Sequence, residues 1–190
     1  MNKLFENWKQ YLSEEKRQYI VLVPGGFKPP HKGHKSMIEQ YAAHPEVEKV
    51  IVFIGSVTRA SSDGSIVISL DQSLKIFDLY GITNNPKIEI RTATKRLSSK
   101  GKEYENPFFD TIDFVNKANP EDYKNKTLTI GYPDKEISRG NIFLGAVKTQ
   151  ISVSVPPIIP RCCHISATRL RDAIANEDEE IIKDSLPDPA

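Results

Sequence analysis

Cysteine is scarce in this chain, and its scarcity excludes two classes of protein. Of the 190 residues only two are cysteines, and they are adjacent at Cys162 and Cys163, which disfavours an ordinary structural disulfide between them. No cluster of histidine and cysteine has the spacing of zinc ligands. We therefore expect neither a disulfide-stapled secreted protein nor a zinc protein, but an intracellular protein of the reducing cytoplasm.

An excess of charge and long hydrophobic runs are also missing. The formal net charge is +1, from 26 basic and 25 acidic residues, so the chain has no global field that would attract nucleic acid. No apolar run approaches the length needed to cross a bilayer, and no signal-peptide core is present. Because 38% of the residues are hydrophobic, one medium-sized core is expected, in a soluble domain without nucleic-acid or membrane partners.

The strongest positive signal is a turn rich in glycine and histidine that follows an apolar segment. Residues 19–23 are apolar and largely β-branched, as expected for a strand buried on both faces. The sequence GGFKPPHKGH follows over residues 25–34, and its leading glycines allow the backbone to approach a ligand closely. His31 and His34 fall at or just before the N-terminus of a helix predicted over 35–43, where free amides favour anions. The turn therefore predicts a phosphate site.

A second anion-binding signal lies near the other end of the chain. Residues 165–171 read ISATRLR and open a helix predicted from about Ala167 to Ala175. Ser166 suits the N-cap of that helix. The hydroxyls and amides at the helix start, with Arg171 one turn further on, would form a cradle for a second anionic group.

Together the two segments resemble the paired signatures of the HxGH-type nucleotidyltransferase superfamily, over roughly Gln18 to Ala175. The resemblance implies a Rossmann-like α/β domain that transfers AMP or CMP from a nucleoside triphosphate to a small phosphorylated acceptor and releases pyrophosphate. It implies no covalent intermediate, and it implies Mg²⁺ bound through the nucleotide phosphates with no ligands from side chains.

The resemblance also implies roles for individual residues. The catalytic residues it implies are His31, His34, Lys28 and Arg171. The nucleotide-binding residues it implies are Gly25, Gly26, Phe27, Gly131, Ile165, Ser166 and Thr168, with Asp134 as a weaker contact. The histidines would stabilise charge on the α-phosphate and its leaving group, and the second motif would hold the β- and γ-phosphates. In-line attack on phosphorus depends on positioning and fixed positive charge more than on a protein nucleophile.

Departures from the family pattern leave the acceptor open. Lys28 replaces an aspartate of some relatives, Gly26 replaces an arginine, and Ala167 replaces a serine. Adenylyl transfer to an acceptor like nicotinamide mononucleotide and cytidylyl transfer to a phosphorylated alcohol both remain open, and the form of the two motifs favours the first. Against a pyridine acceptor, the only tryptophan is Trp8, so Tyr and Phe alone could stack on its ring.

Strand and helix signals alternate along the chain, which predicts a five-stranded parallel sheet flanked by helices. The predicted strands are 19–23, 47–54, 87–91, 127–130 and 151–155. The predicted helices are 35–43, 70–79, 107–118, 167–175 and 177–185. Residues 58–69 are predicted to be a polar loop, and residues 92–106 a mobile loop that carries Lys95, Arg96, Lys100 and Lys102.

The first 17 residues do not belong to this pattern, and we divide the chain into a segment 1–17 and a domain 18–190. Apolar side chains of residues 1–14 would share one face of an amphipathic helix, which must pack on the domain or on a second subunit of a homo-oligomer. The segment also resembles the capsid-targeting peptides of T-even-type phages, with Leu12-Ser13-Glu14 as a cleavage signal. That resemblance implies phage head components as partners, and either residence in the host cytoplasm or packaging in the virion.

Two alternatives to the enzyme remain. A fragment of a class I aminoacyl-tRNA synthetase would share the His-x-Gly-His turn, but the chain has no Lys-Met-Ser-Lys-Ser-like segment and no tRNA-binding domain. A packaged phage head protein that binds nucleotide without turnover would keep the N-terminal signal. The intact residues His31, His34, Thr168 and Arg171 argue against such a loss of activity.

Overall fold

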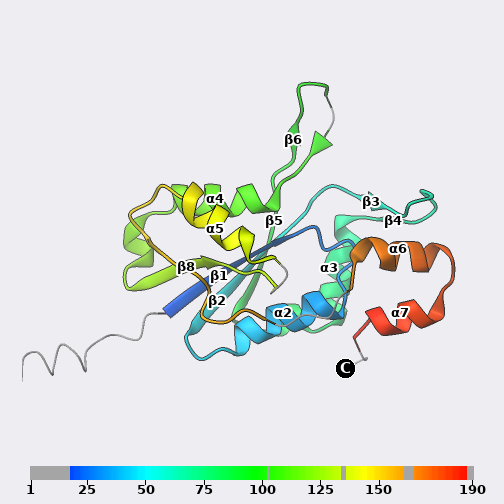
Figure 1. Cartoon of the computed structure of the whole chain (residues 1–190), viewed down its shortest axis with the longest axis horizontal. Coiled ribbons are helices and arrows are strands. Elements are labelled where there is room, and N and C mark those ends of the chain that lie inside the picture. Colours follow the sequence, from blue (N-terminus) through cyan, green and yellow to red (C-terminus); the bar gives the residue numbers. More distant parts are fainter. Residues whose placement is uncertain (1–17, 102, 134–135, 161–164, 188–190) are drawn as a thin grey trace, which may run out of the picture.

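The computed structural model describes residues 18–101, 103–133, 136–160 and 165–187, and a parallel sheet of five strands forms its centre (Figure 1). The strands lie in the order β5-β2-β1-β8-β9. Their bounds are β1 (Gln18–Gly25), β2 (Val47–Ile54), β5 (Ile88–Thr92), β8 (Lys126–Ile130) and β9 (Ser152–Val153). The predicted Rossmann-like sheet is thus confirmed. The strands β2 and β5 lie on one side of β1, and the later strands β8 and β9 lie on the other, so the topological switch point of the sheet is between β1 and β8. Open α/β sheets bind their ligands at such a point.

The central strand β1 is buried on both faces because its side chains alternate between two cores. Val21 and Val23 pack into the core on one face of the sheet. Ile20 and Leu22 pack into the core on the other face. A continuous apolar run is what a parallel strand covered by helices on both sides requires, and this explains why the sequence alone located it.

Helices cover both faces of the sheet (Figure 1). On one face lie α2 (Lys32–Ala43) and α3 (Leu70–Leu79), and on the other lie α4 (Pro107–Lys117) and α5 (Ser138–Ala146). The last two helices, α6 (Ala167–Ala175) and α7 (Glu179–Ser185), pack on each other at one end of the sheet. Short 3-10 helices η1 (Ile82–Asn84) and η2 (Pro120–Tyr123) complete the connections. No helix among the described residues is long and apolar enough to cross a membrane.

Two segments predicted as loops contain short antiparallel ladders, and in this respect the prediction is wrong. Within 58–69, β3 (Arg59–Ala60) pairs with β4 (Val67–Ile68). Within 92–106, β6 (Arg96–Leu97) pairs with β7 (Glu103–Tyr104), and this hairpin projects from the body of the domain (Figure 1). Two-residue strands carry too few side chains to show a period of two in the sequence.

Other departures concern residues 136–160. The predicted fifth strand over 151–155 is shortened to Ser152–Val153, and α5 forms where the sequence analysis expected no element. Gly140 and Gly145 lower the helix propensity of α5, and its apolar residues follow no clear face. The N-terminal segment 1–17, Asp134 and the two cysteines lie outside the described residues, so the interpretations given to them stay predictions.

Candidate functional site

A cavity of about 180 Å³ opens at the carboxyl ends of β1 and β8. Its walls come from the end of β1, the start of α2, the turn after β8, the start of α5 and the segment before α6. The lining residues are Pro24, Gly25, Gly26, Phe27, His31, Gly33, His34, Met37, Gly131, Pro133, Glu136, Arg139 and Ile165. Seven of the predicted site residues are in this set: Gly25, Gly26, Phe27, His31, His34, Gly131 and Ile165. The cavity therefore lies at the switch point of the sheet.

The two histidines stack on each other at the start of α2. His31 is the N-cap residue and is 3% exposed, and its ring centroid lies 3.6 Å from that of His34. The backbone N–H of His31 donates to Nδ1 of His34 at 3.3 Å, which fixes the orientation of the second ring. Phe27 packs edge-on against His34 at 4.8 Å. Both rings thus stand at a helix N-terminus, in the position that favours an anionic ligand.

Close packing of the backbone surrounds these rings, and two glycines permit it. A Cβ on Gly25 would lie 2.7 Å from the Phe27 ring. A Cβ on Gly131 would lie 2.9 Å from side chains of Tyr41 and Val23. Glycine is therefore required at both positions if the backbone that forms the cavity wall is to keep its conformation.

Tyr41 joins the helix that carries the histidines to the turn after β8. Its hydroxyl accepts the Tyr132 backbone N–H at 3.2 Å and donates to the Tyr132 carbonyl at 3.2 Å. Burial raises the pKa of Tyr41 far above its ordinary value, so the hydroxyl stays protonated and can serve in both bonds. The position of Gly131 on the cavity wall is thereby coupled to α2.

Lys28 does not line the cavity, although it lies in the same turn as the histidines. Its side chain is 1% exposed, and its Nζ donates to the Gly55 carbonyl at the end of β2, at 2.5 Å. Burial lowers the pKa of Lys28 to about 8, an effect that the nearby Glu105 carboxylate opposes and Arg59 reinforces. The Lys28 ammonium thus lies between the cavity and the carboxyl end of the neighbouring strand.

The second motif meets the first through Arg171. This guanidinium is 8% exposed and donates to the Lys28 carbonyl, to the Ala60 carbonyl at 2.6 Å and to the Thr168 hydroxyl at 3.1 Å. Burial lowers the pKa of Arg171, which nevertheless starts high enough for the group to stay charged. Arg171 therefore connects α6 to the turn of the histidines and to β3.

The other residues of the second motif are divided between two places. Ile165 lines the cavity of the histidines. Ser166 is the N-cap residue of α6, but its side chain makes no capping hydrogen bond. Ser166 and Thr168 are exposed and line a separate open hollow on α6. The phosphate-binding role predicted for these two hydroxyls remains a prediction.

Arg139 and Glu136 line the cavity and were missed in the sequence. They form an ion pair of 3.0 Å at the start of α5, and the Arg139 side chain is 41% exposed. An exposed pair of this kind is weak, so the guanidinium is available to an anionic ligand. The sequence offered no signal for Arg139, because α5 itself was not predicted.

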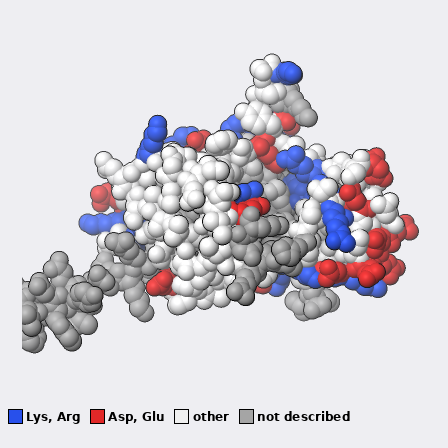
Figure 2. Space-filling model, in the orientation of Figure 1, with Lys and Arg blue, Asp and Glu red and all other residues white. Residues whose placement is uncertain are grey.

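A larger hollow of about 320 Å³ lies between α6 and α7, but its charge does not suit a phosphate ligand. Asp178, Glu180 and Asp184 line it, with Arg169 as its one basic lining residue. Figure 2 shows acidic side chains gathered over this end of the molecule, at the right of the view. The smaller cavity of the histidines is therefore the better candidate for binding a triphosphate.

Among the described residues, no group of three or more His, Cys, Asp or Glu side chains is arranged to hold a metal ion.

The fold and part of the sequence are similar to those of adenylyltransferases. No family model matches the chain. Over 105 residues, 55% of this chain, it is 27% identical to a probable nicotinate-nucleotide adenylyltransferase of Lactococcus lactis, and the match spans 50% of that relative. The nicotinic acid mononucleotide adenylyltransferase of Plasmodium falciparum superposes with a TM-score of 0.53 in its complex with NaAD and 0.50 in its complex with APC. Both superpositions have 15% identity and cover 90% of this chain and 92% of the other.

Proposed function

We propose that this chain, a member of the HxGH-type nucleotidyltransferase superfamily, transfers the AMP moiety of ATP to a phosphorylated nucleotide and releases pyrophosphate. The observation that carries the proposal is the stacked pair His31 and His34 at a helix N-terminus, in a cavity that Ile165 of the second motif also lines. The similarity to a nicotinate-nucleotide adenylyltransferase favours ATP over CTP as the donor. It also favours a pyridine mononucleotide as the acceptor.

The chemistry requires positioning and positive charge. A phosphate oxygen of the acceptor attacks the α-phosphorus of ATP, a new P–O bond forms, and the bond to the bridging oxygen of the β-phosphate breaks. The electron pair leaves with pyrophosphate, whose growing charge His31 and His34 would stabilise. Arg139, which lines the same cavity, would bind a phosphate oxygen and hold the triphosphate in line for attack. Mg²⁺ bound through the phosphates would supply further charge neutralisation.

A pyrophosphate-release assay tests this function directly. The full chain is incubated with each nucleoside triphosphate and with nicotinate mononucleotide, nicotinamide mononucleotide, phosphocholine or glycerol phosphate. We expect release of pyrophosphate only with ATP and a pyridine mononucleotide, together with a dinucleotide product of the corresponding mass. Release with CTP and a phosphorylated alcohol would replace adenylyl by cytidylyl transfer, and no acceptor-dependent release with any pair would contradict the enzyme.

Replacing Arg139 by alanine should weaken ATP binding by about tenfold, because a charge-assisted hydrogen bond to phosphate contributes about 1.5 kcal/mol. Isothermal titration with a non-hydrolysable ATP analogue measures the affinity. Glu136→Gln is the matched control, since it removes the carboxylate that pairs with Arg139 at 3.0 Å and should leave the affinity equal or higher. A loss of affinity in the Glu136 variant and none in the Arg139 variant would remove Arg139 from the binding site.

A further inference from the structure

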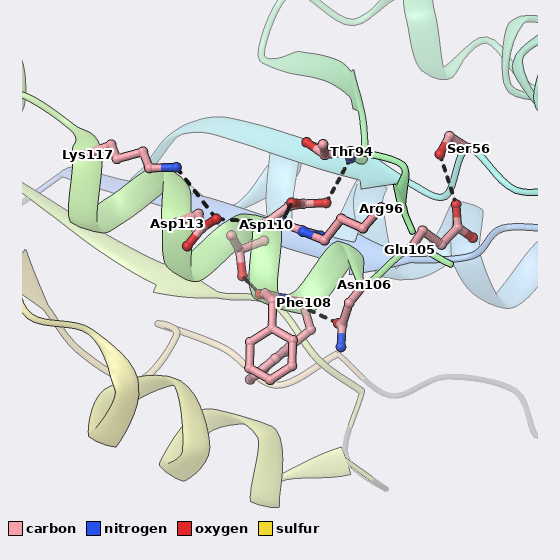
Figure 3. A network of polar contacts seen from close by, with 11 residues as sticks. Ser56, Thr94, Arg96, Glu105, Asn106, Phe108, Asp110, Asp113 and Lys117 are labelled. Atoms are coloured by element: carbon pink, nitrogen blue, oxygen red, sulfur yellow. Dashed lines mark hydrogen bonds and ion pairs between the residues drawn. The ribbon is translucent and has the colours of Figure 1, made fainter. Parts of the chain in front are cut away.

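A buried carboxylate, Glu105, lies at the carboxyl end of β2, outside the cavity of the histidines. Only 1% of its side chain is exposed. Its Oε2 accepts the Val57 backbone N–H at 2.5 Å and the Ser56 hydroxyl at 3.2 Å, and the second of these bonds is drawn in Figure 3. The guanidinium of Arg59 lies 3.5 Å from its other oxygen. The turn that follows β2 is thus organised around one carboxylate.

The same turn is in contact with Lys28. A Cβ on Gly55 would lie only 2.3 Å from Oε1 of Glu105, so the carboxylate rests directly against the Gly55 backbone. The carbonyl of Gly55 accepts the hydrogen bond of the buried Lys28 ammonium at 2.5 Å. Glu105 is therefore linked through a single residue to the segment that carries the histidines.

The fold holds Glu105 in place from both ends of the β6–β7 hairpin. After Glu105 the chain enters α4, whose N-cap residue Asn106 accepts the Phe109 backbone N–H at 3.2 Å. Just before β6, the Thr94 backbone N–H donates to the buried carboxylate of Asp110 at 2.9 Å, and Arg96, the first residue of β6, donates to the same carboxylate at 2.5 Å (Figure 3). The base of the hairpin is thus fixed, and Glu105, which directly follows β7, lies against the turn after β2.

The negative charge of Glu105 acts on Lys28 in addition to the hydrogen bonds that the carboxylate accepts from the turn after β2. A neutral amide at this position could still accept the Val57 N–H, and burying a carboxylate costs free energy unless charges compensate it. Arg59 from β3 contacts Glu105 and acts on the charge of Lys28, while Arg171 from α6 donates to the Lys28 backbone carbonyl. Arg59 and burial both lower the pKa of Lys28, and Glu105 alone raises it. The carboxylate therefore favours the charged form of the ammonium.

We propose that Glu105 is a positioning residue for the acceptor side of the site: it fixes the turn 55–57, against which the Lys28 ammonium is bound, and it keeps the half-exposed Arg59 near the end of β2. Ligands of open α/β sheets bind beyond the carboxyl ends of the strands, so these cations lie where they can attract the phosphate of an acceptor. Glu105 itself touches no substrate and acts through its neighbours. The inference rests on the proposed function for the identity of the acceptor.

Glu105→Gln in the full chain tests this role. Without the carboxylate, the pKa of Lys28 should fall by about one unit, as followed by NMR titration of ¹³C-labelled lysine. Turnover that needs the charged ammonium should then be lost at a pH about one unit lower than in the wild type. KM for the acceptor should rise by about tenfold while KM for ATP stays within about twofold, since the histidine cavity is unchanged.

Two further variants separate charge from structure. Glu103→Gln is the matched control on the same hairpin, because this carboxylate is 57% exposed and its ion pair among the described residues is with Lys95 at 3.5 Å, and it should change neither readout. Glu105→Asp keeps the charge and should restore most of the pKa of Lys28. An unchanged pKa of Lys28 in Glu105→Gln, or equal rises of both KM values with a lower melting temperature, would overturn the inference. Because the NMR titration needs no substrate, it decides this point even if no acceptor supports turnover and the proposed function fails.

Discussion

Replacing His34 by alanine is expected to lower kcat by on the order of a hundredfold or more, because it removes a group that stabilises charge built up only in the transition state. The fold should survive. The imidazole is partly exposed, and its structural contacts include the hydrogen bond from the His31 backbone N–H and ring contacts with His31 and Phe27. Loss of such a capping interaction costs about 1 kcal/mol. Steady-state kinetics with ATP and the acceptor, together with a melting curve, measure the two effects separately.

His44→Ala provides the control for this experiment. His44 lies at the other end of the same helix, where its Nδ1 accepts the Glu46 backbone N–H at 3.3 Å, and it does not line the cavity. A similar small change in melting temperature with unchanged kcat is expected for it. If His34→Ala kept its wild-type kcat, the histidine pair would have no catalytic role and the main support for adenylyl transfer would be lost.

The elements that a local pattern determines were predictable from the sequence. Strand β2 occupies Val47–Ile54, as predicted, because an apolar run ends at Gly55. Helix α3 occupies Leu70–Leu79, as predicted, and Ser69 and Gln72 form a capping box at its start. In both cases the side chains that define the element are neighbours in the sequence, so no tertiary information is needed.

The parts of the site that were missed depend on tertiary contacts. Glu105 is an ordinary acidic residue within a basic segment, and only the contact of its carboxylate with the turn after β2 shows that it is buried. Arg139 lies on a helix without a clear apolar face. For Lys28, the sequence shows a cation near phosphate-binding residues, whereas the structure directs its ammonium to the Gly55 carbonyl. Residue type alone does not give the direction of a long side chain.

Arg171 is the residue for which sequence and structure suggest two different roles, and its replacement separates them. Arg171→Ala removes hydrogen bonds to the carbonyls of Lys28 and Ala60 and leaves these acceptors without their partner. Because the bonds are charge-assisted and the guanidinium is 8% exposed, we expect a loss of about 3 kcal/mol in the free energy of unfolding. For a domain of this size that corresponds to a fall in melting temperature of roughly 6 to 12 °C.

Binding of ATP should weaken in the same variant, whichever role dominates, and Arg171→Lys distinguishes the two. Lysine keeps the charge but cannot reach three acceptors at once. If Arg171 mainly holds phosphate, Arg171→Lys should retain most of the ATP affinity, as measured by isothermal titration. If it mainly ties α6 to the turn of the histidines, Arg171→Lys should lose stability and affinity together. Arg169→Ala, which removes the exposed neighbouring arginine, should change neither quantity. An Arg171→Ala variant with wild-type stability and affinity would show that the two motifs do not act as one site.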